Sequence, residues 1–454
     1  MDTYSTRSSP IGHLFFLLLA AIVAYLLPVL VLADTPLYFA GTTRKILQVT
    51  GDTDQPLRRN TLPMTRTNAG VIATDLGSSF EHNGRLCFLF GDTFGTNGTQ
   101  DRDCLAFSDA TVPEDLTLDF HLGQDGVFLP IAIPSVSQGA YEVPSYGISV
   151  GGNIYIVHTT NWYSTNSNME RSVMARSNDD GLTWTRLYTL SSAQSHDMSQ
   201  AHFINVSMAK IAAEDYPGEL PYATGEIVLI WGSGAYRKSN VYLACIPSAQ
   251  IDDRSALRYL SGYTAGGVPL WSTEESESLA LFEHPCVGEF STAWIAPLQR
   301  WLILYNGSLP RGITMRSALK PWGPFSSGTV ILDPWADSAY GKYLHVPWNW
   351  VRMDGFHDSG RPNEWGGEYG PYLIPRFTRG TARECQIYYT LSTWNPYQTI
   401  LVRSTVGQPL PFTSANEKIY LMPGDETWNT TSPAFFVPLT VAGRAYISTW
   451  TSEQ

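Results

Sequence analysis

Residues 74–93 read TDLGSSFEHNGRLCFLFGDT, and the interpretation of the whole chain starts from this stretch. Its centre, Asn83-Gly84, is a strong signal for a two-residue hairpin turn, because both turn positions need a positive φ. Counting outward from that turn places Asp75 directly opposite Asp92. Like charges on opposed strand residues are destabilising, so two facing carboxylates indicate cation binding, a shared proton or catalysis.

The composition fits a large all-β protein. The chain has 454 residues, of which 43% are hydrophobic and 13% aromatic, together with 38 Gly and 29 Pro. These proportions favour many strands and turns over long helices. The formal net charge of −12 argues against nucleic acid as a partner and leaves no basic patch for anionic membranes. We expect a monomer that acts on neutral or cationic material.

The N-terminus carries an apolar run over residues 14–32, followed by a cleavage-like site after Ala33. We therefore predict a signal peptide over residues 1–33, a single domain over residues 34–454, and secretion without stable membrane association. The apolar run is also long enough to span a bilayer, so an uncleaved signal anchor is the alternative.

Sequons and cysteines agree with the secretory route. Four Asn-X-Ser/Thr sequons predict glycosylation at Asn97, Asn205, Asn306 and Asn429. Cys87 and Cys104 fall on strands expected to be neighbours, which predicts a disulfide in an oxidising compartment. The other three cysteines remain unassigned.

One strand pattern recurs along the chain after the apolar run. An apolar strand that ends in a small or polar residue appears at 85–92, 153–159, 226–233, 301–307 and 386–392. A shorter strand of small and polar residues precedes each one, and another short strand follows it. The preceding strands are expected at 73–79, 144–150, 202–208, 288–296 and 370–376. Such repeats predict a five-bladed β-propeller of four-stranded antiparallel blades. Either residues 45–51 or residues 444–450 supply the strand that closes the ring.

The innermost strands of a propeller line its central channel, so candidate site residues are sought at their ends. Both ends of the first hairpin, with Asp75 and Asp92, point to one mouth. Glu289 lies at a matching depth in the fourth repeat. Further polar and aromatic side chains near the same mouth are candidates for sugar binding. They are Glu142, His158, Trp162, Arg237, Tyr372 and Trp394.

These carboxylates suit glycoside hydrolysis, which needs an acid to protonate the leaving oxygen and a carboxylate as base or nucleophile. We favour Asp75 as base, Asp92 as acid and Glu289 as a third carboxylate, with the order of the two aspartates left open. Alternatively, both aspartates bond backbone groups at strand ends. No zinc-type spacing or calcium loop is visible, so we predict no metal or cofactor, although Ca²⁺ in the channel would suit the carboxylates.

A family resemblance extends over residues 44–406. It rests on the motifs at 74–77 (TDLG), 89–94 (LFGDTF) and 288–291 (GEFS), together with the repeated hairpins. By these motifs the chain resembles the secreted propellers catalogued as domain of unknown function 4185. Members of that family have been grouped as glycoside hydrolase family 183, which acts on D-arabinofuranose polymers.

The resemblance implies furanosidase chemistry, with Asp75 and Asp92 as the essential pair. The expected function is that of a secreted glycoside hydrolase, favoured to be endo-acting, that cleaves arabinofuranosyl linkages of the D-arabinan type. The alternative is a non-catalytic glycan-binding propeller at the cell surface, because function resides in the site and not in the fold.

Overall fold

The computed structural model describes residues 35–350, 353–408, 434–441 and 444–451. The predicted signal peptide and the sequon at Asn429 lie outside these residues. Within them, no helix is both long enough and apolar enough to cross a membrane.

Five groups of antiparallel strands follow one another along the described chain, and the pairing of β15 with β18 joins the third group and the fourth into one nine-stranded sheet. The first contains β5 (Val71–His82), β6 (Arg85–Gly95), β7 (Arg102–Ser108) and β8 (Asp119–Phe120). The second contains β9 (Pro144–Val150), β10 (Asn153–Tyr163), β11 (Asn168–Ser177) and β12 (Thr185–Ser192). The third contains β13 (Asn205–Ala212), β14 (Glu226–Ser233), β15 (Ser239–Pro247) and β16 (Arg258–Tyr263), with β17 (Pro269–Ser272) beside β16.

The last two groups complete the ring. The fourth contains β18 (Phe282–Ile295), β19 (Arg300–Ser308), β20 (Arg311–Ala318) and β21 (Thr329–Leu332). The fifth contains β22 (Glu368–Leu373), β24 (Cys385–Thr393), β25 (Gln398–Gly407) and β2 (Arg44–Gln48). The remaining strands and the one described α-helix are β1 (Leu37–Tyr38), β3 (Thr53–Asp54), β4 (Arg59–Asn60), α2 (Thr65–Ala69), β23 (Arg379–Gly380), β26 (Ala434–Val441) and β27 (Arg444–Thr451).

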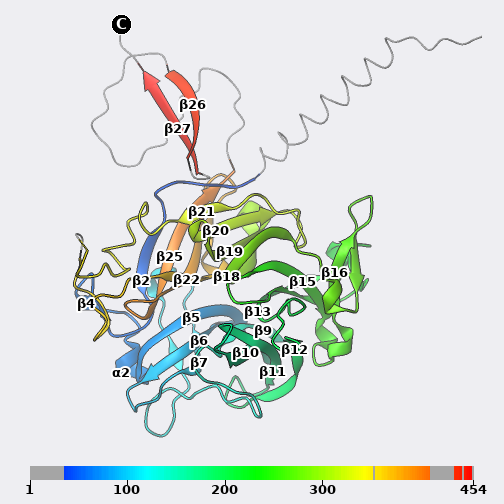
Figure 1. Cartoon of the computed structure of the whole chain (residues 1–454), viewed down its shortest axis with the longest axis horizontal. Helices are drawn as coiled ribbons and strands as arrows, with labels where there is room; N and C mark the ends of the chain where they lie inside the picture. Colours follow the sequence, from blue (N-terminus) through cyan, green and yellow to red (C-terminus); the bar gives the residue numbers. More distant parts are fainter. Residues whose placement is uncertain (1–34, 351–352, 409–433, 442–443, 452–454) are drawn as a thin grey trace, which may run out of the picture.

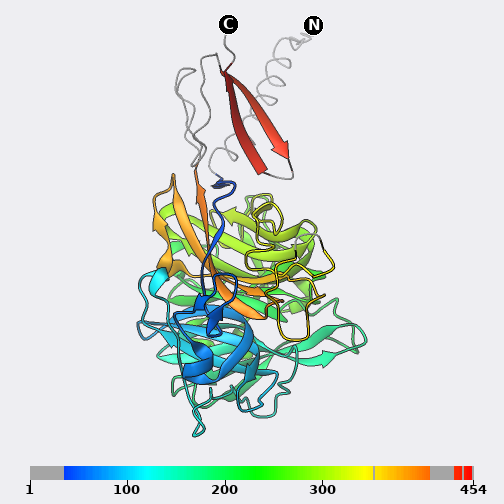
Figure 2. The same ribbon diagram turned by 90° about the vertical axis from the view of Figure 1, so that its left-hand side faces the viewer.

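The inner strands β5, β9, β13, β18 and β22 contact one another in succession, and β22 returns to β5 (Figure 1). This closed ring confirms the predicted propeller of antiparallel blades. Figure 2 shows the dark-blue N-terminal chain running alongside the orange fifth sheet, where β2 pairs with β25. The strand at residues 45–51 therefore closes the ring. The alternative at residues 444–450 is wrong, because β27 pairs with β26.

Apolar side chains from facing sheets fill the space between neighbouring blades. Leu89 of the first blade, for example, shares a buried cluster with Ile154 and Ile156 of the second. Between the third and fourth blades, the rings of Trp231 and Trp301 lie 5.4 Å apart. Each such side chain contributes roughly 1.5–3 kcal/mol when fully buried. This packing holds the inner strands, and the side chains at their ends, in fixed positions.

The predicted turn at the tip of the first hairpin is present. Asn83 and Gly84 have φ values of 48° and 84°, and His82 pairs with Arg85 across the turn. The left-handed backbone required at both positions explains why Asn and Gly occur there.

The register of that hairpin changes further from the turn. A shift occurs between Leu76 and Ser78, where Gly77 has φ 91°. Asp75 consequently pairs with Gly91, so the prediction that it lies directly opposite Asp92 is wrong. The cause is a β-bulge, which inserts an extra residue into one strand and redirects the side chains that follow it.

The predicted disulfide between Cys87 and Cys104 is also wrong, because both thiols are free. Cys104 pairs with Phe90, whereas Cys87 pairs with Phe107. Since side chains alternate along a strand, a cysteine three residues from Phe90 projects from the opposite face of the blade. The two thiols accordingly belong to different apolar clusters, one on each side of the first sheet.

Candidate active site

A pocket of about 560 Å³ opens at one end of the inner ring. Every inner strand contributes to its lining, through Asp75 of β5, Ser145 of β9, Asn205 of β13, Glu289 of β18 and Tyr369 of β22. All five strands begin or have a register shift near these residues, so polar side chains at equivalent depths converge. The blade repeat therefore creates the pocket that the sequence predicted.

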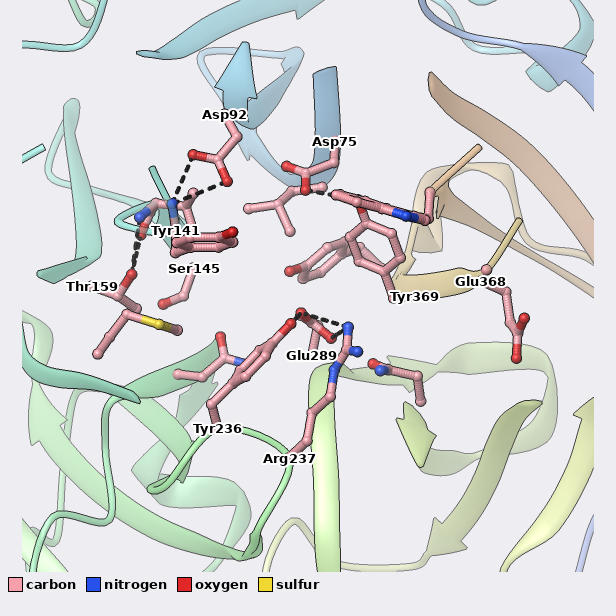
Figure 3. A pocket seen from close by; sticks show the side chains of 18 of the residues that line it. Asp75, Asp92, Tyr141, Ser145, Thr159, Tyr236, Arg237, Glu289, Glu368 and Tyr369 are labelled. Carbon is pink, nitrogen blue, oxygen red and sulfur yellow. Dashed lines mark hydrogen bonds and ion pairs between the residues drawn. The ribbon is translucent and has the colours of Figure 1, made fainter. Parts of the chain in front are cut away.

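Asp75 is one of two acidic side chains on the hairpin wall of this pocket (Figure 3). It is 7% exposed, and its Oδ2 accepts a hydrogen bond of 2.8 Å from the Tyr369 hydroxyl. Burial raises the pKa of Asp75 to about 7, although the hydroxyls of Tyr397 and Tyr369 oppose the rise. These neutral donors favour the ionised carboxylate without neutralising its charge.

Asp92 is the second acid on that wall, and it comes from β6. Its two oxygens accept hydrogen bonds from the Tyr141 backbone N–H at 3.0 and 3.2 Å. Burial, followed by the negative charges of Asp75 and Asp103, raises the pKa of Asp92 to about 9. Because the two aspartates interact, they titrate as a pair that retains one proton between these two pKa values.

Glu289 lies across the pocket from the two aspartates (Figure 3). Its Oε1 accepts a hydrogen bond of 2.8 Å from the Tyr236 hydroxyl. The Arg237 guanidinium donates to both carboxylate oxygens at 3.3 Å, and it also lies 4.8 Å from the centre of the Tyr236 ring. Glu289 is therefore an ion-paired carboxylate, unlike Asp75 and Asp92.

A second acid–arginine pair lies on the same wall as Glu289. Glu368 is 9% exposed, and its oxygens accept hydrogen bonds from Arg311 at 3.2 and 3.3 Å. Burial raises the pKa of Glu368, and the charge of Arg311 opposes that rise. The pocket thus combines two carboxyls bonded to neutral donors with two carboxylates bonded to guanidinium groups.

The sequence missed several of these pocket residues, among them Arg311, Glu368, Tyr369 and Tyr397. The inner strand of the fifth blade was expected from residue 370, whereas β22 begins at Glu368. Because the expected strand began two residues too late, Glu368 and Tyr369 were left out when the ends of the inner strands were compared. Tyr397 comes from the turn between β24 and β25, and its approach to Asp75 depends on how the fifth blade packs against the first.

Four predicted sugar-binding residues do line the pocket. They are Trp162, Arg237, Tyr372 and Trp394. The Tyr372 ring is fully buried in the floor, and its hydroxyl has no hydrogen-bond partner within the described protein. An unpaired buried hydroxyl is unfavourable unless a ligand or water satisfies it, so Tyr372 suits a contact to substrate.

Glu142 and His158 are placed behind the pocket, so the prediction that they bind substrate is wrong. Glu142 accepts the Trp162 backbone N–H at 2.9 Å and the Ser137 hydroxyl at 2.7 Å, and it thereby braces the loop beside the pocket. His158 is fully buried, and its Nε2 lies 2.7 Å from Asp103 Oδ2. Its partner Asp103 carries the negative charge that contributes to the raised pKa of Asp92.

The described sequons occupy different surroundings. Asn97 is exposed, in agreement with a surface acceptor. Asn205 and Asn306, by contrast, line the pocket, and Asn306 is 6% exposed. A glycan needs an acceptor on a surface loop, so the prediction of glycosylation at Asn306 is wrong.

Tyrosine or arginine side chains hold Asp75, Glu289 and Glu368, whereas the backbone N–H of Tyr141 holds Asp92. Across the described residues, no three His, Cys, Asp or Glu side chains form a group that could hold a metal ion.

Comparisons with known proteins provide one family match and several similar solved structures. The model of the family described as "Domain of unknown function (DUF4185)" matches residues 62–403. No curated protein matches the chain.

Among solved structures, an exo-β-1,3-galactanase from Phanerochaete chrysosporium is similar at 8% identity with a TM-score of 0.43, over 82% of this chain and 65% of the galactanase. This chain therefore spans less than two thirds of that enzyme. A GH43_1 enzyme from Xanthomonas citri complexed with xylotriose is 9% identical with a TM-score of 0.39, over 77% of this chain and 93% of that one. A β-xylosidase/α-arabinofuranosidase from a compost metagenome is 11% identical with a TM-score of 0.39, over 74% and 92%.

Proposed function

We propose, from the premise that this chain belongs to the DUF4185 family, that its pocket hydrolyses glycosidic bonds with Asp92 as acid and Asp75 as base. One observation carries the proposal. The buried carboxyl of Asp75 and the half-buried carboxyl of Asp92 share a pocket, and their different surroundings separate their pKa values, to about 7 and about 9. Pairs of titratable groups with separated pKa values are typical of acid–base assignments in enzymes.

In the proposed reaction, Asp92 supplies the proton. Its high pKa keeps the carboxyl protonated at neutral pH, so that it can protonate the leaving oxygen as the glycosidic C–O bond breaks. The Tyr141 N–H fixes the orientation of the carboxyl by contacting both oxygens. Asp92 leaves this step as a carboxylate and regains its proton from solvent.

Asp75 supplies the base. The Tyr369 hydroxyl stabilises its ionised form, which takes a proton from the attacking water while the water oxygen bonds to the anomeric carbon. The ion-paired Glu289 and Glu368, with their arginines, provide fixed acceptors and donors for sugar hydroxyls. Trp162 and Trp394 offer aromatic faces for the sugar rings.

For the substrate we propose arabinofuranosyl linkages of the D-arabinan type, cleaved internally by a protein secreted through the N-terminal segment. The family resemblance supports this choice of sugar, and the predicted signal supports secretion. The proposed partner is consequently a polysaccharide.

The experiment is incubation of the purified protein, from Asp34 onward, with D-arabinan, L-arabinan and arabinogalactan, followed by measurement of new reducing ends. We expect turnover of D-arabinan, and its loss in Asp75→Asn and Asp92→Asn. Binding of these glycans without turnover of any of them would instead support the glycan-binding alternative.

A further inference from the structure

The connection between β21 and β22 is the longest irregular part of the described ring, and it is the yellow segment that runs between these strands in Figure 1. Its described parts, residues 333–350 and 353–367, contain no named helix or strand. Connections in compact domains have a median of about 4–6 residues, and much longer ones are usually functional or disordered. This connection is ordered by contacts such as the hydrogen bond from the Tyr340 hydroxyl to the Gly366 carbonyl at 3.2 Å.

Three tryptophans of this connection form an exposed aromatic cluster, defined as Trp335, Trp350 and Trp365. Their ring centroids are separated by 6.4 Å (335–350), 5.7 Å (335–365) and 5.4 Å (350–365). Their exposed fractions are 46%, 48% and 36%. Single exposed apolar residues are ordinary, but a contiguous group of large exposed rings marks a binding surface.

Contacts lead from this cluster into the pocket. The ring of Tyr340 packs beneath it, 4.6 Å from Trp335 and 5.2 Å from Trp365. The guanidinium of Arg311 lies 5.4 Å from the centre of the Tyr340 ring, and it bonds Glu368 inside the pocket. The aromatic cluster is therefore continuous with the candidate active site through two adjoining side chains.

We propose that the aromatic cluster is a carbohydrate subsite, which binds sugar residues of the polymer beyond the bond that is cleaved. This inference rests on the proposed function, because a polysaccharide cleaved internally must continue outside the pocket. Indole rings offer large apolar faces to the C–H faces of sugars together with a polar N–H edge. The mutual tilts of 51°, 64° and 67° turn the three faces in different directions, which suits a curved furanoside chain.

The charges around the cluster favour a neutral sugar over an anionic membrane. Asp333 accepts the Trp335 backbone N–H at 2.9 Å, and the exposed Glu364 directly precedes Trp365. With a net charge of −12, the chain lacks the excess of Lys and Arg that attracts anionic lipids.

The test compares a Trp335→Ala/Trp350→Ala double variant with the wild type on two substrates. On the long polymer we expect KM to rise about tenfold, which corresponds to the loss of favourable aromatic contacts. On a short arabinofuranosyl oligosaccharide that fits within the pocket, kcat and KM should remain as in the wild type. The single variant Trp350→Ala should show a smaller rise in KM for the polymer.

Trp294→Ala is the matched control. Trp294 is 40% exposed, and it lies near the end of β18 that is remote from Glu289. This substitution removes an exposed indole far from the pocket mouth and should leave the KM for the polymer unchanged. Melting temperatures of all variants establish that they are folded.

The outcomes separate this inference from the proposed function. If the wild type cleaves the polymer and the double variant does so with the same KM, the cluster is not a subsite and the hydrolase proposal stands.

If the wild type cleaves no furanoside, the hydrolase proposal fails. Retardation in native gels containing D-arabinan then tests the cluster alone, and equal retardation of wild type and double variant, or none, overturns the inference. Binding to phosphatidylcholine vesicles that requires Trp335 and Trp350, without Trp-dependent retardation, overturns it in favour of a lipid surface.

Discussion

Two walls of one pocket bury their carboxyl groups in opposite ways. On the wall formed by the β5–β6 hairpin, Asp75 is bonded to the Tyr369 hydroxyl and Asp92 to a backbone N–H. On the wall formed by β18 and β22, each glutamate lies 3.2–3.3 Å from an arginine nitrogen. All four carboxyls line the same cavity.

In the proposed function, this difference separates proton transfer from substrate binding. Burial without a nearby cation disfavours the ionised carboxyl, so the hairpin wall retains a proton that it can transfer. On the opposite wall a guanidinium compensates the charge of each carboxylate, so in the proposed function these ion pairs orient the substrate. The positions of Arg237 and Arg311, more than the depths of the acids, distinguish the wall suited to catalysis from the wall suited to binding.

The largest expected effect comes from removing the transferable proton. Asp92→Asn and Asp75→Asn keep the size and shape of each side chain, and each should lower kcat on the order of 10²- to 10⁴-fold, the range typical of general acid–base catalysis. Glu368→Gln, on the opposite wall, should lower kcat far less. Initial rates of reducing-end release measure all three. Equal losses on both walls would abolish the distinction between them.

The pH dependence of kcat/KM is the next largest effect. Asp75 must be ionised and Asp92 protonated, so the profile should be bell-shaped, with an acid limb at about 7 and an alkaline limb at about 9. Activity should fall about tenfold per pH unit outside these limbs. Asp103→Asn should move the alkaline limb downward, because it removes a negative charge that raises the pKa of Asp92. Two limbs in the ordinary range of carboxyl groups would show that burial does not raise the pKa of either acid.

The sequence predicted the propeller because its strand pattern is strictly local. Alternation and turn chemistry act over a few residues, and they located the hairpin turn at Asn83-Gly84 correctly. The same repeat counting brought Asp75, Asp92 and Glu289 to a single pocket.

What the sequence could not predict depends on backbone irregularities and on contacts between blades. The bulge at Gly77 changes the partner of Asp75, and alternation alone does not reveal it. The pairing of Arg311 with Glu368 joins two blades across a long connection, so no local pattern contains it. The free Cys87 and Cys104 show that neighbouring strands permit a disulfide only when both side chains lie on the same face.

A further prediction concerns the binding wall. Arg311→Gln removes the guanidinium from Glu368 and from substrate hydroxyls, and it should raise KM about tenfold, the effect of losing a charge-assisted hydrogen bond. Because Arg311 is remote from the proton-transfer pair, kcat should change little. Steady-state kinetics separate the two parameters. A fall in kcat at constant KM would assign Arg311 to the chemical step, contrary to the comparison of the two walls.

The smallest expected effect is on stability, and it has opposite signs on the two walls. The pKa of Asp92 is about 9 in the folded protein, against 3.8 for the unperturbed group, so the folded state binds the proton more tightly than the unfolded state. Asp92 therefore contributes most stability below the unfolded pKa, and this contribution is lost progressively as the pH rises towards the folded pKa. The asparagine of the Asp92→Asn variant does not titrate, so the stability of this variant does not fall with rising pH in this way.

Asp92→Asn should consequently be more stable than the wild type by at least about 1 kcal/mol near pH 8, with the difference shrinking towards pH 4. Glu368→Gln should instead be less stable than the wild type near neutral pH, because it leaves Arg311 without its anion. Urea unfolding of the three proteins at several pH values measures both differences. If both substitutions destabilise the protein equally at every pH, Asp92 does not retain a proton through burial, and the two walls are electrostatically alike.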